Sequence, residues 1–216
     1  SISIEKKPEI RKAGGVFYTP NFVVEFIIEN TIGVKISEKS PEWISDIKII
    51  DPACGSGSFL VSAYDYLLKY HLQYYTSDVK KRNQALKKAY IYQIDETTYY
   101  LSNDIKRQIL LNNIYGVDID LQAVEVTKLS LLLKMMEDEH IEAGQRLFKH
   151  SEYRLLPDLS KNIKCGNSII SEDFYNNKDV TKYNNDDLRK INAFNWEDKF
   201  PNIMNNNKFD CVIGNP

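Results

Sequence analysis

Short runs of mainly apolar residues occur along the chain, and they predict most of its strands. Residues 47–51 and 114–118 are apolar segments of strand length, each followed by apolar residues at helical spacing. We expect two further strands at 162–165 and 209–213, the last of them apolar enough to be buried on both faces. Strands that alternate with helices predict an α/β fold with a mostly parallel sheet and flanking helices.

Capping residues and apolar spacing predict three helices. The first opens at Thr19 as a candidate N-cap, with Pro20 at the first helical position, and should end near Thr31. Asp120 is the candidate cap of the helix after the second strand. The expected apolar stripes are Val23, Phe26 and Ile27 in the first helix, Leu60, Ala63, Tyr64, Leu67 and Leu68 in the second, and Val126, Leu129, Leu133 and Met136 in the third.

Two stretches do not fit a simple alternation of strands and helices. Residues 72–113 are rich in tyrosine and predict a helical insertion that packs its tyrosines on the core. Residues 176–207 hold ten asparagines, which favour turns, so we expect a mobile or irregular segment. The expected organisation is one domain over 1–216, divided into a lead-in at 1–15, a first helix and strand-turn-helix at 16–71, the insertion at 72–113, and a second half at 114–216.

Composition limits the class of protein without identifying it. A chain of 216 residues and 25.1 kDa, with 43% hydrophobic and 27% charged residues, suits one globular α/β domain. No apolar run approaches the ~20 residues that span a bilayer, so we expect no membrane contact. The formal charge of −2 provides no global basic field, so any DNA contact must be local or supplied from elsewhere. Three widely spaced cysteines and no apolar signal segment fit a reducing cytoplasm.

A glycine-rich turn after the first strand is the main candidate for ligand binding. Gly55-Ser56-Gly57 lies between a predicted strand and a predicted helix, where backbone N–H groups and the helix dipole can meet a nucleotide-like cofactor. The third glycine of the dinucleotide fingerprint is replaced by Leu60, and no Gly-Lys-Ser/Thr follows, so NAD and phosphate-loop chemistry are disfavoured. A plain structural turn stays an alternative.

Two polar residues after later strands extend the candidate site. Asp118 ends the second strand, where a carboxylate can accept the hydroxyls of a ribose. It lies further from the glycine turn than the usual ~20 residues, and the insertion accounts for the excess. A helix-capping role suits Asp120 better. Asn167, after the third strand, would lie beside an adenine, although Gly166-Asn167-Ser168 also fits an ordinary turn.

The fourth strand leads into Gly214-Asn215-Pro216, the position where substrate would meet cofactor. At this point a family resemblance is plain, because five motifs occur in the family's order. The chain resembles S-adenosylmethionine-dependent DNA adenine-N6 methyltransferases, above all those fused within combined restriction-modification enzymes. The motifs are 15–20 (GVFYTP), 51–60 (DPACGSGSFL), 115–120 (YGVDID), 166–168 (GNS) and 214–216 (GNP).

The resemblance implies a Rossmann-like class I methyltransferase fold, incomplete at its C-terminus, that binds S-adenosylmethionine. Tyr18, Thr19 and Pro20 would line the methionine end of this cofactor. Its floor would be the segment from Asp51 through Ala53, Cys54 and Gly55 to Gly57, and Phe59 would shape the turn. Asp118 would accept the ribose hydroxyls, with Ile119 against the adenine and Asn167 near its amino group, where the family often has Asp.

The resemblance also implies how methyl transfer would work. The Asn215 side-chain oxygen and the Pro216 carbonyl would accept the two N–H bonds of an adenine amine and direct its lone pair at the sulfonium methyl. The adenine must leave the DNA duplex to reach them. In the family the motif continues with a second proline and an aromatic residue, which this chain lacks, so we expect a fragment without independent activity. Double-stranded DNA, a C-terminal recognition domain and an attached endonuclease would be its partners in a longer protein.

Several alternatives stay open on sequence alone. Methylation of RNA or of a protein glutamine shares the Asn-Pro ending, and a non-catalytic scaffold could keep the fold. We interpret Cys54 as a small packed residue of the turn and not as a nucleophile. No metal is expected, because His71, His140 and His150 show no ligand spacing. The methyltransferase hypothesis requires the loops near residues 18, 55 and 118 to converge around one cofactor molecule, with Asn215 facing its reactive carbon.

Overall fold

The computed structural model describes residues 19–137, 156–177, 183–205 and 208–215. Tyr18 and Pro216, two of the predicted site residues, therefore lie outside the described residues. So do the histidines at 140 and 150 and the basic residues Lys6, Lys7, Arg11 and Lys12, whose clustering fits a DNA contact, a connection to an upstream nuclease domain or a solvated surface. Within the described ranges, no helix is both long and apolar enough to cross a membrane.

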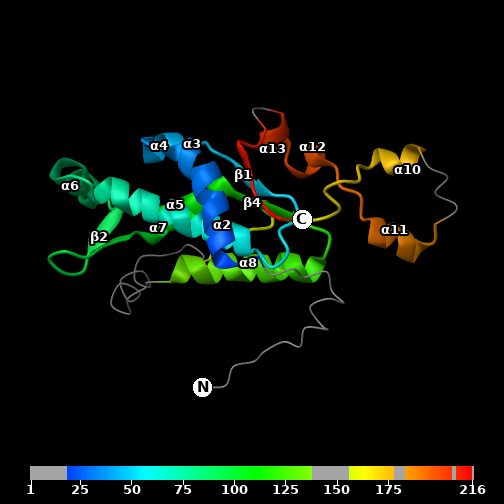
Figure 1. Ribbon diagram of the computed structural model, residues 1–216, viewed down its shortest axis with the longest axis horizontal. Coiled ribbons are helices and arrows are strands. Elements are labelled where there is room, and N and C mark those ends of the chain that lie inside the picture. Colours follow the sequence, from blue (N-terminus) through cyan, green and yellow to red (C-terminus); the bar gives the residue numbers. More distant parts are fainter. Residues whose placement is uncertain (1–18, 138–155, 178–182, 206–207, 216) are drawn as a thin grey trace, which may run out of the picture.

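A four-stranded parallel sheet forms the centre of the fold (Figure 1). Its strands are β1 (Ile49–Asp51), β4 (Ile114–Asp118), β5 (Ile163–Cys165) and β6 (Cys211–Val212), in the order β5-β4-β1-β6. Ile49 pairs with Ile114 on one side and with Cys211 on the other. All four strands were predicted from the sequence. The parallel sheet with flanking helices confirms the predicted α/β, Rossmann-like architecture.

The larger core fills one face of this sheet. Helices α5 (Ser58–Thr76), α7 (Asn103–Asn113) and α8 (Leu121–Met136) pack there with Ile49, Ile114 and Ile163 of the strands. Helix α2 (Asn21–Ile28) adds to this layer and continues through a π-helical turn, η1 (Glu29–Gly33), into α3 (Val34–Ile36). A short helix, α4 (Pro41–Ile44), leads toward β1.

The start and the buried stripe of α2 differ from the prediction. Pro20, and not Thr19, is the N-cap, and no side chain caps this helix. The predicted stripe is displaced as well, since Phe26 is 65% exposed. The helical path also runs past Thr31 to residue 36. Both sides of this segment are apolar, so packing on α5 and not local spacing selects the buried side, which consists of Val24, Ile28, Ile32 and Ile36.

The predicted buried side of helix α8 is also wrong. Its cap is as predicted, because the Asp120 carboxylate accepts a hydrogen bond from the Gln122 N–H at 2.8 Å. The predicted apolar stripe faces outward, however, and Leu129 is 57% exposed. The helix is apolar on several sides, so its spacing does not determine which side is buried. The side that packs inward carries Val124, Thr127, Leu131 and Met135.

The segment 72–113 is only partly helical. It contains the end of α5, helix α6 (Val79–Lys87), helix α7 and an antiparallel hairpin of β2 (Ile91–Gln93) and β3 (Tyr99–Leu101). The hairpin was not predicted, because its strands are three residues long and its tyrosines were read as helical. The packing of tyrosines on the core is confirmed, since Tyr75 is buried and Tyr90 and Tyr99 pack against the main core.

The asparagine-rich region forms more regular structure than predicted. Its described residues include the end of α10 (Asp173–Asn177) and helices α11 (Asn185–Ile191), α12 (Trp196–Lys199) and α13 (Pro201–Met204). Several asparagines are helix caps: Asn184 closes a capping box, Asn192 ends α11 at φ 43°, and Asn195 caps α12. Asparagine is favoured at such caps for the same reason that it is favoured in turns.

This region also supplies the core on the second face of the sheet. Phe194, Phe200 and Ile203 pack there against Ile50 and Val117. Strand β6 was expected to be buried on both faces, but Val212 is 64% exposed. Within the described sheet β6 is an edge strand, and only its side with Cys211 and Ile213 is covered.

Candidate functional site

The four parallel strands place every described candidate loop at one edge of the sheet. Carboxyl ends of parallel strands share an edge, and ligands of such sheets bind outside it, where the strand order reverses. The segments that emerge there are 51–57 after β1, 118–120 after β4, 166–168 after β5 and 213–215 after β6. Strands β4 and β5 lie on one side of β1, and β6 lies on the other side. The strand order therefore reverses between β1 and β6. The glycine turn therefore lies at the expected position for a ligand.

Left-handed backbone shapes the glycine turn. Gly55 has φ 53° and Gly57 has φ 85°, a region that favours glycine. A Cβ on Gly57 would lie 2.8 Å from Thr127 Oγ1 of α8, whereas a Cβ on Gly55 would meet nothing within 4 Å. Gly57 thus permits close packing of the turn on α8, and Gly55 faces open space that a ligand can enter.

Thr127 is a site-forming residue that the sequence analysis missed. It is fully buried, and its hydroxyl donates to the Gly55 carbonyl at 2.8 Å. A threonine among the apolar residues of α8 was the available signal, because a buried hydroxyl needs a partner. Thr127 therefore holds the glycine turn in place from helix α8.

Asp118 connects three loops through its carboxylate and its backbone carbonyl. Its Oδ2 accepts from the Gly55 N–H at 2.7 Å and its Oδ1 from the Asp120 N–H at 2.9 Å. The Gly166 N–H donates to the Asp118 backbone carbonyl at 2.8 Å. Each carboxylate oxygen has more than one lone pair, so both can accept further hydrogen bonds. Asp118 is partly exposed, and its hydrogen bonds fix its orientation, as a residue that binds hydroxyl groups requires.

Asp51 is a buried carboxylate beneath the end of β6. It is 2% exposed, and its Oδ1 accepts from the Ala53 N–H at 3.0 Å. Burial raises the pKa of Asp51 to about 6, the Ala53 N–H opposes this shift, and the charge of Asp118 adds to it. A Cβ on Gly214, whose φ is 143°, would lie 2.7 Å from Asp51 Oδ1. The carboxylate thus lies directly against the backbone that precedes Asn215.

Asn215 and Thr19 meet although they are 196 residues apart in the sequence. The Asn215 amide nitrogen donates to the Thr19 hydroxyl oxygen at 3.3 Å. Thr19 is buried just before α2, next to the exposed Pro20. The first and last described segments are thereby joined at the edge that carries the glycine turn.

The residues expected around an adenine also lie at this edge. Ile119 follows Asp118 and is 49% exposed, so it offers an apolar surface to a ligand. The side-chain oxygen of Asn167 accepts from the N–H groups of Ile169 and Ile170, at 3.1 and 3.2 Å. This local turn leaves the amide nitrogen of Asn167 as the group that can face a ligand.

Two predicted residues point into the core. Cys54 is buried, and its Sγ lies 4.0 Å from Thr127 Oγ1. Burial and the nearby Asp51 and Asp118 charges raise the pKa of the Cys54 thiol to about 12, so it is no nucleophile at neutral pH. Phe59 is buried in the main core. Their side chains support the turn from within.

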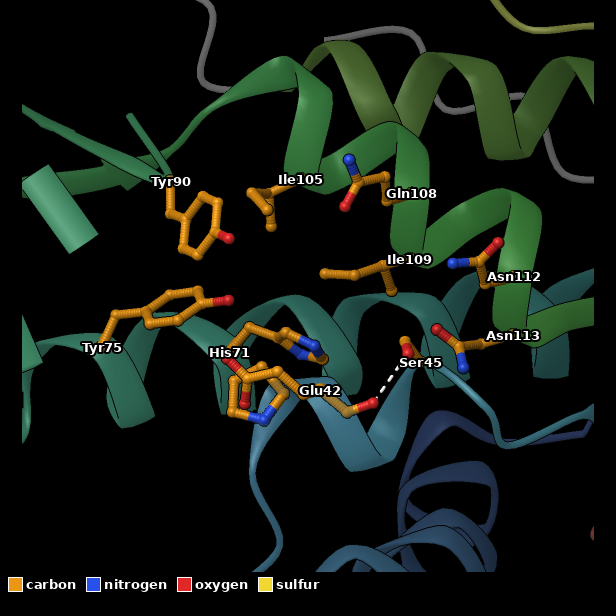
Figure 2. A pocket seen from close by; sticks show the side chains of 11 residues that line it. Glu42, Ser45, His71, Tyr75, Tyr90, Ile105, Gln108, Ile109, Asn112 and Asn113 are labelled. Carbon is orange, nitrogen blue, oxygen red and sulfur yellow. Dashed lines mark hydrogen bonds between the residues drawn. The ribbon is translucent and has the colours of Figure 1, made fainter. Parts of the chain in front are cut away.

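A separate cavity of about 190 Å³ lies at the opposite edge of the sheet (Figure 2). It is lined by His71 and Tyr75 near the end of α5 and by Asn113, which directly precedes β4. The His71 Nδ1 bonds the Leu67 carbonyl at 2.7 Å, and burial lowers the pKa of this imidazole. None of the predicted site residues lines this cavity. In the described part of the chain, no group of His, Cys, Asp or Glu side chains is arranged to hold a metal ion.

Residues 112–216 match the family described as "Eco57I restriction-modification methylase". The chain is 33% identical, over 93% of its length, to the type II restriction enzyme and methyltransferase RM.Eco57I of Escherichia coli. It is 32% identical, over 74% of its length, to the putative type II restriction enzyme and methyltransferase RM.MjaORFECS2P of Methanocaldococcus jannaschii. These alignments span only 17% and 15% of those relatives.

One solved structure is also similar. It is a nuclease-deletion mutant of the Type ISP restriction-modification enzyme LlaGI in complex with a DNA substrate mimic, with a TM-score of 0.48 and 18% identity. The match covers 95% of this chain and 13% of that one.

Proposed function

We propose that this chain belongs to the restriction-modification methylases and forms the cofactor-binding part of a DNA methyltransferase, which the family match over 112–216 and the 33% identity to RM.Eco57I support. The reaction would transfer a methyl group from S-adenosylmethionine to N6 of an adenine in double-stranded DNA. The observation that carries this proposal is the convergence of the loops around Thr19, Gly55, Asp118 and Asn215 at one sheet edge.

The residues at this edge fit S-adenosylmethionine. The open space at Gly55 allows a ligand to approach the backbone, and the two acceptor oxygens of Asp118 suit the hydroxyls of a ribose. Asp51 is a carboxylate whose ionised form is disfavoured by burial, so it gains from a cation such as an amino-acid ammonium. Ile119 offers an apolar surface to the adenine. The cofactor supplies an electrophilic methyl group on sulfur.

Asn215 is the residue we assign to the substrate. An exocyclic adenine amine is a poor nucleophile because its lone pair is delocalised into the ring. An acceptor such as the Asn215 side-chain oxygen, together with the Pro216 carbonyl, bends the amine toward tetrahedral geometry and directs its lone pair at the methyl group. The target base has to leave the duplex to reach this position.

DNA recognition is assigned to other parts of a longer protein. The chain covers about a sixth of the relatives' length, and its formal charge of −2 favours no broad contact with phosphates. We therefore expect the 216 residues to bind cofactor but to methylate no DNA alone. A recognition domain and an endonuclease domain are the proposed partners in the longer polypeptide.

The test is methyl transfer by the full-length protein to duplex DNA. Asn215→Ala should lower kcat by about 100-fold or more, because an acceptor at the reacting amine is lost, while cofactor affinity stays unchanged. Asn112→Ala is the matched control, since Asn112 is an exposed asparagine at the opposite edge. Full activity of Asn215→Ala would overturn the assigned role. Transfer to RNA or to a glutamine peptide, with none to DNA, would overturn the substrate.

A further inference from the structure

The Thr19 hydroxyl has a partner that its position in sequence did not indicate. It was expected to cap α2, but it caps nothing, and it accepts a hydrogen bond from the Asn215 amide nitrogen at 3.3 Å. Thr19 is also one of the residues that the family resemblance places at the methionine end of the cofactor. The buried Thr19 hydroxyl thus contacts the proposed catalytic amide, and it belongs to the segment that the resemblance assigns to the cofactor.

The two ends of the Asn215 side chain are chemically opposite. Its oxygen only accepts hydrogen bonds and its nitrogen only donates, and a half-turn of the amide exchanges them. The proposed reaction needs the oxygen at the adenine amine. With its nitrogen bonded to Thr19, the amide directs its oxygen away from Thr19, and the tight packing of Gly214 on Asp51 fixes the backbone that carries it.

A hydroxyl by itself does not select one end of an amide, because it can donate as well as accept. Once its single proton is given to another acceptor, only its lone pairs are left for Asn215. The Asn215 nitrogen is then the end that can bond to it. The orientation of the amide therefore depends on what receives the Thr19 proton.

We propose that Thr19 is a positioning residue that couples cofactor binding to the orientation of Asn215. Its hydroxyl donates to an acceptor atom at the methionine end of the bound cofactor and, in consequence, holds Asn215 by its nitrogen with the oxygen toward the substrate. This inference rests on the proposed function. It differs from a mere cofactor contact, because it assigns to Thr19 an effect on the chemical step.

Kinetics of the full-length enzyme separate the two roles. Thr19→Val keeps the shape of the side chain and removes the hydroxyl, and Thr19→Ser keeps the hydroxyl. We expect Thr19→Val to lower kcat at saturating cofactor by about 10- to 100-fold, since misorientation of a reacting group has effects of this size, and Thr19→Ser to stay within about threefold of wild type. If Thr19→Val raises only the KM for cofactor and leaves kcat unchanged, the positioning role is wrong.

A spectroscopic measurement on the 216-residue chain needs no turnover. The probe is S-adenosylhomocysteine, and the readout is the pair of side-chain amide signals of ¹⁵N-labelled Asn215. We expect these signals to shift on ligand binding in wild type and in Thr19→Ser, and to stay unchanged in Thr19→Val although ligand still binds. Unchanged signals in ligand-bound wild type would overturn the coupling without any variant.

The two proposals can fail separately. If the wild-type full-length enzyme binds the cofactor but methylates no DNA, the proposed function fails, and the amide signals of Asn215 still decide the coupling. If the enzyme methylates DNA and Thr19→Val matches wild type in kcat, the coupling alone fails.

Discussion

Similar polar side chains have different roles at the two edges of the sheet. At the amino edge, the buried Asn113 amide donates both hydrogens to the carbonyls of Ile44 and Ile47, at 2.7 and 2.8 Å. Asn162 likewise donates to the carbonyls of two residues beside the start of β4, both at 2.9 Å. Both N–H groups of each amide are bonded to backbone carbonyls of the same chain, although the buried Asn113 Oδ1 has no hydrogen-bond partner in the described structure.

At the carboxyl edge the polar groups keep hydrogen-bonding capacity. Asp118 accepts from two N–H groups with lone pairs left over, and Asp51 is a buried carboxylate with a raised pKa. Asn215 has one hydrogen bond from its nitrogen, to Thr19. A side chain that satisfies its own fold stabilises it, whereas one with spare capacity is available to a ligand. Substitutions at the two edges should therefore separate stability from binding.

The largest effect on stability is expected at the amino edge. Asn113→Leu takes the Asn113 donor from the Ile47 carbonyl and one of two donors from the Ile44 carbonyl, which keeps the Ile47 N–H. This change should reduce the free energy of unfolding by about 2–4 kcal/mol. Urea denaturation of the 216-residue chain measures this change. Asn112→Leu, at the neighbouring exposed position, should change stability by no more than about 0.5 kcal/mol. Equal effects of the two substitutions would contradict the role of Asn113.

Asp51 should make the protein without cofactor less stable as pH rises. Its pKa is about 6 in the folded chain, above the ~3.9 of an unfolded aspartate. The folded state therefore binds more protons between these values, and the free energy of unfolding should fall by roughly 2–3 kcal/mol as pH rises from about 4 to above 6. Asp51→Asn should remove this fall and weaken cofactor binding. An identical pH dependence in wild type and variant would contradict the raised pKa.

The two glycines of the turn should respond differently to alanine. Gly57→Ala meets Thr127 at positive φ, and should lower stability by about 2 kcal/mol or more. Gly55→Ala has the strain of positive φ alone, about 1 kcal/mol, but puts a methyl group into the ligand space. We expect it to weaken S-adenosylmethionine binding more than it lowers stability. Calorimetric titration and thermal melting of both variants test this, and the reverse ranking would contradict it.

The smallest effect is expected at Ile119. Because its side chain is half-exposed, Ile119→Ala should leave stability within about 0.5 kcal/mol. Loss of apolar contact with an adenine should weaken cofactor binding by about 1 kcal/mol, a fewfold change in Kd. Leu129→Ala, on the exposed side of α8, is the control and should change neither quantity. An Ile119→Ala chain that binds cofactor as wild type does would place the adenine elsewhere.

Strong local signals made much of the fold predictable. The strands that begin at 49 and 114 are apolar runs followed by a glycine turn or a capping carboxylate, and Asp120 caps α8 as expected. The predicted core-facing sides of α2 and α8 were wrong, because both helices carry apolar residues on more than one side and packing selects the side that is buried. The β2–β3 hairpin was missed because its strands are too short to show a period.

The site was predictable as a set of loops and not as a set of contacts. Parallel strands bring the ends of β1, β4, β5 and β6 to one edge, so their loops could be grouped in advance. The bond between Thr19 and Asn215, and the support of Gly55 by Thr127, join residues distant in sequence. No local pattern specifies such pairs. They arise only when helices and strands have packed.

Titration of S-adenosylmethionine into the 216-residue chain tests the central claim most directly. The account predicts saturable binding of one cofactor per chain, lost in Asp118→Ala and retained in Asn215→Ala. No detectable heat and no shift in Tm at millimolar cofactor would contradict it and would favour a scaffold that has the fold without the site.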